Sequence, residues 1–270
     1  MVKNLLKACC MIAALTAAGQ AAAETYTVGS GGTYRPFEFE NSQKQLEGFD
    51  IDIIKAIAKA EGFDVKLVNT PWEGIFATLN TGDRDIIISG ITITDKRKQM
   101  VDFSAPYFPA EQSIVVAQDS QVDSLAALKN EKVGVVNSST GDIVVSEVLG
   151  KNSTAIKRFD NTPLMLQELF EDGVSAAVGD VGVVKYYIKQ HPEKQFKLVP
   201  DAKFEWRKAT ANCWAKSTPG CKRSLLTGLT PKSIKPGSTT TCRRCQRNNP
   251  PFSVTTAIAQ AIAVFFREGL

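Results

Sequence analysis

Three short polar segments contain the side chains best suited to bind a small charged molecule. The first follows an apolar run, and its candidates are Ser89, Gly90, Thr92 and Arg97. Gly90 permits close approach of the backbone, Thr92 offers a hydroxyl group, and Arg97 offers a planar guanidinium that can bind a carboxylate with two hydrogen bonds. This segment therefore predicts a site for an anionic group.

The second segment favours the same kind of anionic group, and the third would bind a positive charge. Asn137, Thr140 and Gly141 lie between a predicted strand and a predicted helix, where free N–H groups and the helix dipole favour an anion. Asp180 ends a later strand and could accept a hydrogen bond from an ammonium group. Ligands of open α/β sheets bind beyond the carboxyl ends of the strands, so the three segments together predict a site for an α-amino acid. Alternatively, Thr140 and Asp180 are ordinary helix N-caps and Arg97 is a surface residue.

Strand-like and helix-like runs alternate along the chain in two series. Strands are predicted at 25–29, 65–68, 85–89, 113–117, 132–136, 155–159, 175–179 and 196–199. Helices are predicted at 50–60, 74–81, 125–129, 140–149, 163–171 and 181–189. This alternation predicts an α/β fold of two lobes, each with a mostly parallel sheet and flanking helices. A proline-containing break predicts lobe 1 at 24–108, a hinge crossing at 109–112 and lobe 2 at 113–204.

The composition is that of a soluble protein, with 43% apolar and 22% charged residues among 270. No apolar run reaches the roughly 18 residues of a membrane span, which excludes an integral transporter. The chain has one histidine, His191, which argues against a histidine-rich metal site or a serine–histidine–aspartate triad.

Residues 1–23 are typical of a secretory signal peptide, because two lysines precede a short apolar run that ends in small residues. We predict cleavage before Glu24 and export to a bacterial periplasm. A lipid anchor at Cys9 or Cys10 is not favoured, since Lys7 stands where a lipid-attachment motif has a small apolar residue.

The body of the chain resembles the periplasmic polar amino-acid-binding proteins of ABC importers, over about residues 25–205. The segments that carry this resemblance are GGTYRPFEF, GFDIDI and GIFATLNTGDRDIIISGITITDKRKQMVDFSAPY. The similarity is to the glutamine-binding and lysine/arginine/ornithine-binding branch. It implies a two-lobed periplasmic binding protein of type II, with two hinge crossings, that closes on one amino acid and delivers it to a membrane permease driven by an ATPase. It implies a monomer, peripheral to the membrane, with no cofactor or metal.

The resemblance also implies roles for individual residues. Arg97 would bind the α-carboxylate, helped by Thr92 and by N–H groups near Thr140 and Gly141. The α-ammonium group would be held by Thr92, by Asp180 and by the carbonyl of Gly90. Tyr34 and Trp72 fall where the family places aromatic rings against the ligand side chain.

Three departures from the family pattern concern ligand choice. An acid of the family is replaced by Gly31, a lysine of the glutamine binders by Asn137, and a larger side chain by Gly179. A buried cationic side chain needs a counter-charge. The loss of the acid at Gly31 therefore favours a glutamine-like ligand, with a basic amino acid as the alternative.

The last 64 residues differ from the rest. Residues 207–270 contain eleven lysines and arginines and one acid, Glu268, whereas the whole chain has 32 bases and 28 acids. Codons compatible with residues 208–246, when read from one base earlier, encode GNGELLGKINAGLQKI and then ITADGTYAKIYQTWFDDDVPPLP, which matches the tail of the family. We therefore interpret 205–270 as a would-be return to lobe 1 that is out of frame, with a gene lesion before Arg207.

The basic tail and the scaffold leave other functions open. Cys242 and Cys245 have CxxC spacing, but Cys213 and Cys221 do not form a matching second pair, so zinc binding is not expected. Nucleic-acid binding is not expected either, because no recognised motif accompanies the positive charge. An enzyme of the periplasmic dehydratase type on the same scaffold is the main alternative to a binding protein.

Overall fold

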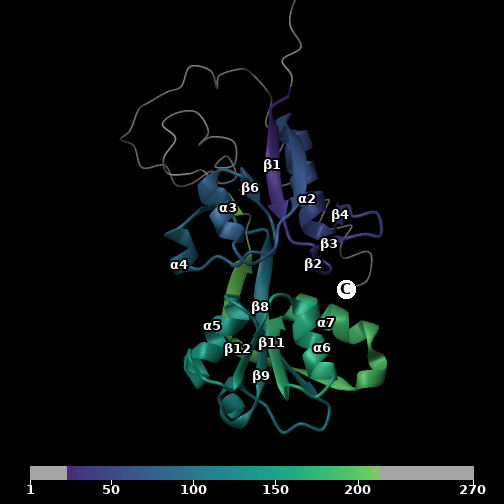
Figure 1. Cartoon of the computed structure of the whole chain (residues 1–270), viewed down its shortest axis with the longest axis vertical. Helices are drawn as coiled ribbons and strands as arrows, with labels where there is room; N and C mark the ends of the chain where they lie inside the picture. The colour runs from purple at the N-terminus through teal and green to yellow at the C-terminus, as the bar shows by residue number, and fades with distance from the viewer. Residues whose placement is uncertain (1–22, 209–210, 213–270) are drawn as a thin grey trace, which may run out of the picture.

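The computed structural model describes residues 23–208 and 211–212 and forms an α/β fold of two lobes (Figure 1). In lobe 1 a five-stranded sheet has the order β5-β1-β6-β13-β7. Its strands are β1 (Thr25–Ser30), β5 (Asp64–Asn69), β6 (Ile86–Ile87), β7 (Asp102–Phe103) and β13 (Ala211–Asn212). Strands β5 and β6 are parallel to β1, whereas β13 is antiparallel to both β6 and β7.

A small antiparallel sheet and three helices complete lobe 1. The small sheet consists of β2 (Thr33–Tyr34), β3 (Glu38–Glu40) and β4 (Leu46–Glu47). The helices are α2 (Phe49–Glu61), α3 (Ile75–Thr81) and α4 (Asp95–Lys98). Helix α2 buries its isoleucines at the spacing expected for an amphipathic helix, and it ends at Gly62, which adopts the left-handed conformation.

Lobe 2 contains a second five-stranded sheet, in the order β10-β9-β11-β8-β12. Its strands are β8 (Phe108–Ala117), β9 (Val133–Val136), β10 (Ile156–Phe159), β11 (Ala176–Asp180) and β12 (Phe196–Lys208). Its helices are α5 (Thr140–Leu149), α6 (Thr162–Phe170) and α7 (Val181–Gln190), with 3₁₀ turns at η1 (Leu125–Asn130) and η2 (Pro192–Lys194). Strands β9, β10 and β11 are parallel, and β8 and β12 are antiparallel to each other.

Two paired strands join the lobes. Strands β8 and β12 run side by side from lobe 2 toward lobe 1 (Figure 1), and their register shifts between Pro200 and Glu205. Beyond that shift the pairing continues to Lys208 opposite Phe108. The chain thus crosses between lobes twice at neighbouring positions, which is the arrangement of a hinge.

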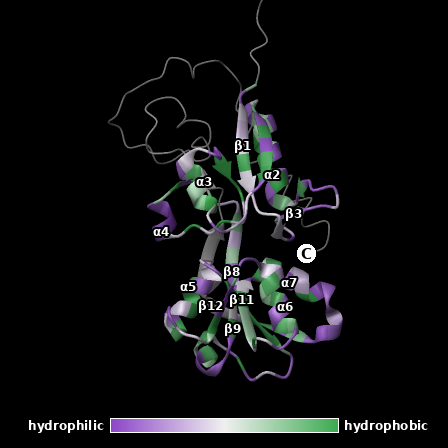
Figure 2. Ribbon diagram, viewed as in Figure 1, coloured by the Kyte–Doolittle hydropathy of each residue, from purple (hydrophilic) through white to green (hydrophobic). Residues whose placement is uncertain are grey.

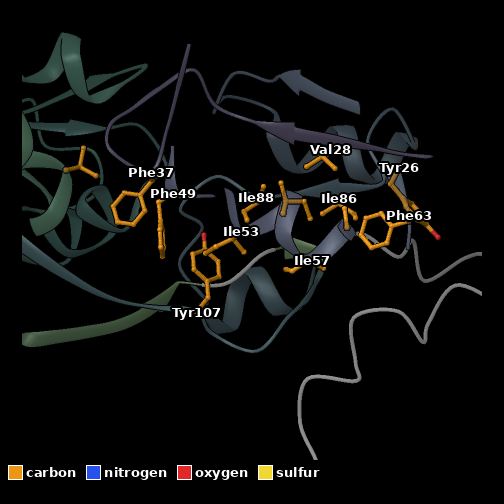
Figure 3. Packing of buried hydrophobic residues seen from close by; sticks show 13 residues of the cluster. Tyr26, Val28, Phe37, Phe49, Ile53, Ile57, Phe63, Ile86, Ile88 and Tyr107 are labelled. Carbon is orange, nitrogen blue, oxygen red and sulfur yellow. The ribbon is translucent and has the colours of Figure 1, made fainter. Parts of the chain in front are cut away.

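Each lobe has its own apolar core. The main cluster of lobe 1 runs from Tyr26 and Phe63 at one end of the sheet to Phe37 and Phe49 at the other (Figure 3). This cluster also includes Val183 of helix α7, so lobe 2 packs against lobe 1 at that end. Figure 2 shows hydrophobic and hydrophilic residues along each of α2, α6 and α7, as expected for helices with one buried side.

Five of the six predicted helices correspond to α2, α3, α5, α6 and α7, and α5 occupies the predicted range, whereas 125–129 forms the 3₁₀ turn η1. The small sheet β2–β3–β4 and the short elements α4 and β7 were not predicted, because they are too short to show a periodic pattern. Residues 1–22 of the predicted signal peptide and all six cysteines lie outside the described residues, as does the segment 205–270 apart from the backbone of 205–208 and 211–212. In the part of the chain that is described, no helix is long and apolar enough to cross a membrane.

Candidate functional site

A cavity of about 380 Å³ lies between the two lobes. Nine of the ten predicted site residues line it: Tyr34, Trp72, Ser89, Gly90, Thr92, Arg97, Thr140, Gly141 and Asp180. The tenth, Asn137, does not line the cavity, and its side chain is exposed. Its carbonyl oxygen instead accepts a hydrogen bond from Trp72 Nε1 at 2.9 Å. Residues that are spread over about 150 positions of the sequence, from Tyr34 to Asp180, thus line one cavity, where a small molecule would contact both lobes.

Arg97 is buried at the cavity wall, with only 5% of its surface exposed. Thr94 caps the short helix α4, and its side chain accepts a hydrogen bond from Arg97 N. The guanidinium donates to the carbonyl oxygens of Thr92 at 3.0 Å and Ser138 at 3.2 Å. The ring of Trp72 lies 5.1 Å away. These contacts hold the guanidinium in one orientation.

Among the described residues, no acid forms an ion pair with Arg97. Burial lowers the pKa of Arg97 to about 10. The group is therefore still protonated at neutral pH, and a buried positive charge favours an anionic partner from outside the chain. A ligand carboxylate has the matching charge and shape.

A buried aspartate positions the loop at Ser89 and Gly90. Asp50, at the start of α2, accepts hydrogen bonds from Gly90 N at 2.6 Å and from the Tyr107 hydroxyl at 2.9 Å. Gly90 has a φ of 52°, a left-handed conformation that glycine adopts without a steric penalty. Burial, followed by the charges of Asp50 and Glu38, raises the pKa of Tyr107 well above its usual value, so its hydroxyl remains a donor. The loop is thus fixed from behind the cavity.

The lobe 2 wall is organised by Gln112, which was not predicted as a site residue. Its Nε2 donates to Thr140 Oγ1 at 3.0 Å and to Asp180 Oδ1 at 2.6 Å. Ser139 is the N-cap of α5, and Thr140 is therefore the first helical residue rather than a cap. Asp180 does occupy the N-cap position of α7, although its side chain makes no capping hydrogen bond. Both residues line the cavity.

Gly141 allows helix α5 to approach the neighbouring strand closely. A Cβ atom at this position would lie 2.6 Å from the backbone oxygen of Val178. We expect Gly141→Ala to displace the start of α5, to lower the stability of the chain by about 1–3 kcal/mol and to weaken ligand binding. Thermal melting and calorimetric titration would measure both effects.

The matched control is Gly182→Ala, at the second position of α7. A Cβ atom there would meet only the Phe37 ring, at an ordinary contact distance of 3.5 Å. Equal losses of affinity in the two variants would contradict a specific role of the Gly141 contact.

The cavity lining is strongly acidic. Among the described residues that line it, four are acids and Arg97 is the one basic residue; the acids are Glu38, Glu73, Asp160 and Asp180. An α-amino acid would match Arg97 with its carboxylate and one acid with its ammonium group. Of the other three acids, Glu38 is buried whereas Glu73 and Asp160 are exposed to solvent, so a further positive group on the ligand would be attracted most strongly by Glu38.

Glu38 supplies a carboxylate beside Gly31, where the sequence interpretation assumed that no acid was present. Strand β3 pairs with β2 so that Glu38 stands opposite Tyr34. Its Oε1 accepts a hydrogen bond from Ser89 Oγ at 2.7 Å and lies 3.6 Å from where a Cβ atom of Gly31 would be. A carboxylate from position 38 thus occupies the space beside Gly31 that a side chain at 31 would enter. The argument for a glutamine-like ligand was wrong in its premise that no counter-charge is present.

Contacts between the lobes flank the cavity on both sides. On one side Trp72 and Arg97 of lobe 1 donate to the carbonyls of Asn137 and Ser138. On the other side the Tyr187 hydroxyl donates to the Thr33 carbonyl at 3.1 Å. The two lobes are therefore closed over the cavity. Within the described residues, no group of three or more His, Cys, Asp or Glu side chains is arranged to hold a metal ion.

The fold is that of a two-lobed protein with a cavity between the lobes that charged and aromatic side chains line. Comparison with known proteins agrees with this description. The family model of bacterial extracellular solute-binding proteins, family 3, matches residues 26–263, and the chain belongs to that family.

Individual relatives extend the comparison. A protein of Neisseria gonorrhoeae named "Probable histidine-binding protein" is 43% identical over 181 residues, which are 66% of this chain and 68% of the relative. The arginine-, lysine-, histidine-binding protein ArtJ from Geobacillus stearothermophilus has a TM-score of 0.68 and 36% identity, covering 72% of this chain and 84% of ArtJ. The ancestral amino acid-binding protein AncCDT-1, a precursor of cyclohexadienyl dehydratase, has a TM-score of 0.63 and 36% identity, covering 70% of this chain and 81% of AncCDT-1.

Proposed function

We propose that this protein binds a basic L-amino acid in the periplasm and delivers it to an ABC importer. The observation that carries the choice of a basic ligand is the acidic lining: among the described residues, Glu38, Glu73, Asp160 and Asp180 line the cavity together with one basic residue, Arg97. The names of the Neisseria and Geobacillus relatives, which refer to histidine, arginine and lysine, support the same class. This replaces the glutamine-like ligand that the sequence favoured.

In this proposal the backbone of the ligand is held between the two lobes. The α-carboxylate binds Arg97 and the N–H groups at the start of α5. The α-ammonium group binds Asp180 and Thr92. Gln112 supports this arrangement, since its hydrogen bonds fix Thr140 and Asp180 at a common position.

The ligand side chain extends toward lobe 1 in the same proposal. Tyr34 and Trp72 provide aromatic surfaces, which attract a cationic group. Glu38 provides the counter-charge, and its hydrogen bond with Ser89 keeps the carboxylate in place.

We further propose that the protein acts by binding and transport, without catalysis, as a monomer that docks on a permease and its ATPase. A ligand that contacts both lobes stabilises the closed form, and the hinge strands β8 and β12 permit the change. The names of the relatives, which describe binding proteins, support a function in binding.

The test is a series of thermal melts of the full chain with each of the common L-amino acids. At about 100 times its dissociation constant, a ligand adds about 2.7 kcal/mol of stability, which raises the melting temperature of a protein of this size by about 5 °C or more. We expect such a rise with L-arginine, L-lysine or L-histidine and a smaller one with L-glutamine. A rise with neutral or acidic amino acids alone would contradict the proposal.

A further inference from the structure

One turn of lobe 2 receives both hydrogen bonds that lobe 1 donates on this side of the cavity. The turn consists of residues 137–139, between β9 and α5. Asn137 O accepts from Trp72 Nε1, and Ser138 O accepts from Arg97 Nη2. The two hydrogen bonds between the lobes can therefore form here only if both carbonyl groups, of Asn137 and Ser138, point toward lobe 1.

The conformation of this turn is not one that its sequence favours. Ser138 has a φ of 58°, in the left-handed region that non-glycine residues rarely adopt. The turn therefore needs support from its surroundings, since in a relaxed conformation the carbonyl of Ser138 would point elsewhere.

The support comes from Asp142, on the first turn of α5. Its Oδ2 accepts a hydrogen bond from Ser138 N at 3.0 Å, and its own N–H donates to Ser139 Oγ at 3.1 Å. Asp142 is thus bonded to the backbone of the strained residue itself. Burial would raise the pKa of Asp142, but hydrogen bonds from Arg158, Ser138 and Ser146 outweigh it and lower the pKa, so the carboxylate is ionised at neutral pH.

Arg158, on strand β10, holds Asp142 in place. Its Nε lies 3.0 and 3.1 Å from the two carboxylate oxygens of Asp142, and its Nη2 lies 2.9 Å from Oδ1. The guanidinium also donates to Ser146 Oγ and to the Lys151 carbonyl. The side chains are 28% and 12% exposed for Arg158 and Asp142, so the pair is largely screened from water.

We propose that Asp142 and Arg158 are positioning residues for lobe closure, which set ligand affinity without touching the ligand. Neither residue lines the cavity. They act by holding Ser138 in the left-handed conformation that presents two carbonyls to Trp72 and Arg97. The inference rests on the proposed function in one respect, because the assay measures binding of an amino acid.

The experiment compares affinities for L-arginine, measured by calorimetric titration of the full chain, in variants that separate positioning from folding. We expect Arg158→Gln to weaken binding about tenfold, comparable with the loss of one good hydrogen bond. Adding Ser138→Gly in the same chain should restore most of the affinity, because glycine adopts positive φ without a side chain to hold it. The matched control is Lys157→Gln, which removes the neighbouring Lys157–Glu168 ion pair and should leave the affinity unchanged.

The design has two further parts. Thermal melting of each variant measures its folding. A second probe is an equimolar mixture of the twenty common L-amino acids. An unchanged affinity in Arg158→Gln would overturn the inference. A loss that Ser138→Gly does not restore would also overturn it, since that result describes a purely structural role. If the wild-type chain binds the mixture but none of L-arginine, L-lysine and L-histidine, the choice of ligand class is overturned, and the same ratios, measured with the mixture, decide the positioning role. A wild-type chain that binds neither probe overturns both proposals.

Discussion

Replacing Arg97 by lysine is expected to weaken amino-acid binding by about a hundredfold or more. The guanidinium is held by the carbonyls of Thr92 and Ser138 and can offer two further N–H donors to a carboxylate. Lysine keeps the charge but offers a single ammonium group, so about two charge-assisted hydrogen bonds are lost or distorted, at a cost of about 3 kcal/mol. Calorimetric titration of the variant with the best ligand of the wild-type chain measures the loss.

A matched control for this change is Arg84→Lys. Arg84 also lies in lobe 1 and donates to Thr70 Oγ1 at 3.0 Å, but it does not line the cavity. Its replacement should leave affinity within about threefold of the wild type, a difference below 1 kcal/mol. An Arg97→Lys chain that binds as tightly as Arg84→Lys would contradict the role of Arg97 in holding the α-carboxylate.

Replacing Glu38 by glutamine is expected to remove the preference for basic amino acids. Glutamine has nearly the same shape and can still accept the hydrogen bond from Ser89, so the local structure should persist. Only the negative charge is lost. We expect affinity for the cationic ligand to fall about 10- to 100-fold, the range for hydrogen bonds to charged groups, while affinity for L-glutamine stays constant or rises.

Glu40→Gln provides the control, because Glu40 lies on the same strand, outside the cavity lining, where it pairs with Lys44 at 3.7 Å. This variant should keep the ligand preference of the wild-type chain. If Glu38→Gln lowers affinity for basic and neutral amino acids by the same factor, Glu38 supports the shape of the site and does not select charge.

The polar centre of the site could be predicted because its residues stand at the ends of regular elements. Thr140 comes after the buried strand β9 and Asp180 is the last residue of β11, and the carboxyl ends of these two parallel strands lie at one edge of the sheet. Arg97 could be predicted from the spacing of a polar segment after an apolar run. The ends of strands and the starts of helices have local sequence patterns, so these positions can be predicted from a single sequence.

Glu38 and Gln112 could not be predicted in the same way. Glu38 enters the site through the two-residue pairing of β2 with β3, which is too short for a periodic pattern. Gln112 lies in β8, which the sequence analysis began only at residue 113, and the side chain reaches the site because β8 pairs with β11. Both depend on tertiary pairing between segments. The preference for a glutamine-like ligand followed from this, since Gly31 was judged without knowing that Glu38 lies beside it.

The measurement that tests the central claim most directly is a comparison of dissociation constants for cationic and neutral amino acids of similar size. L-arginine, L-lysine and L-histidine would be titrated into the full chain beside L-citrulline and L-glutamine, under identical buffer conditions. Citrulline has nearly the shape of arginine without its charge. The acidic lining predicts that at least one cationic amino acid binds tenfold or more tightly than both neutral ones, a difference of about 1.4 kcal/mol. Binding of citrulline or glutamine as tight as that of all three cationic amino acids would contradict it.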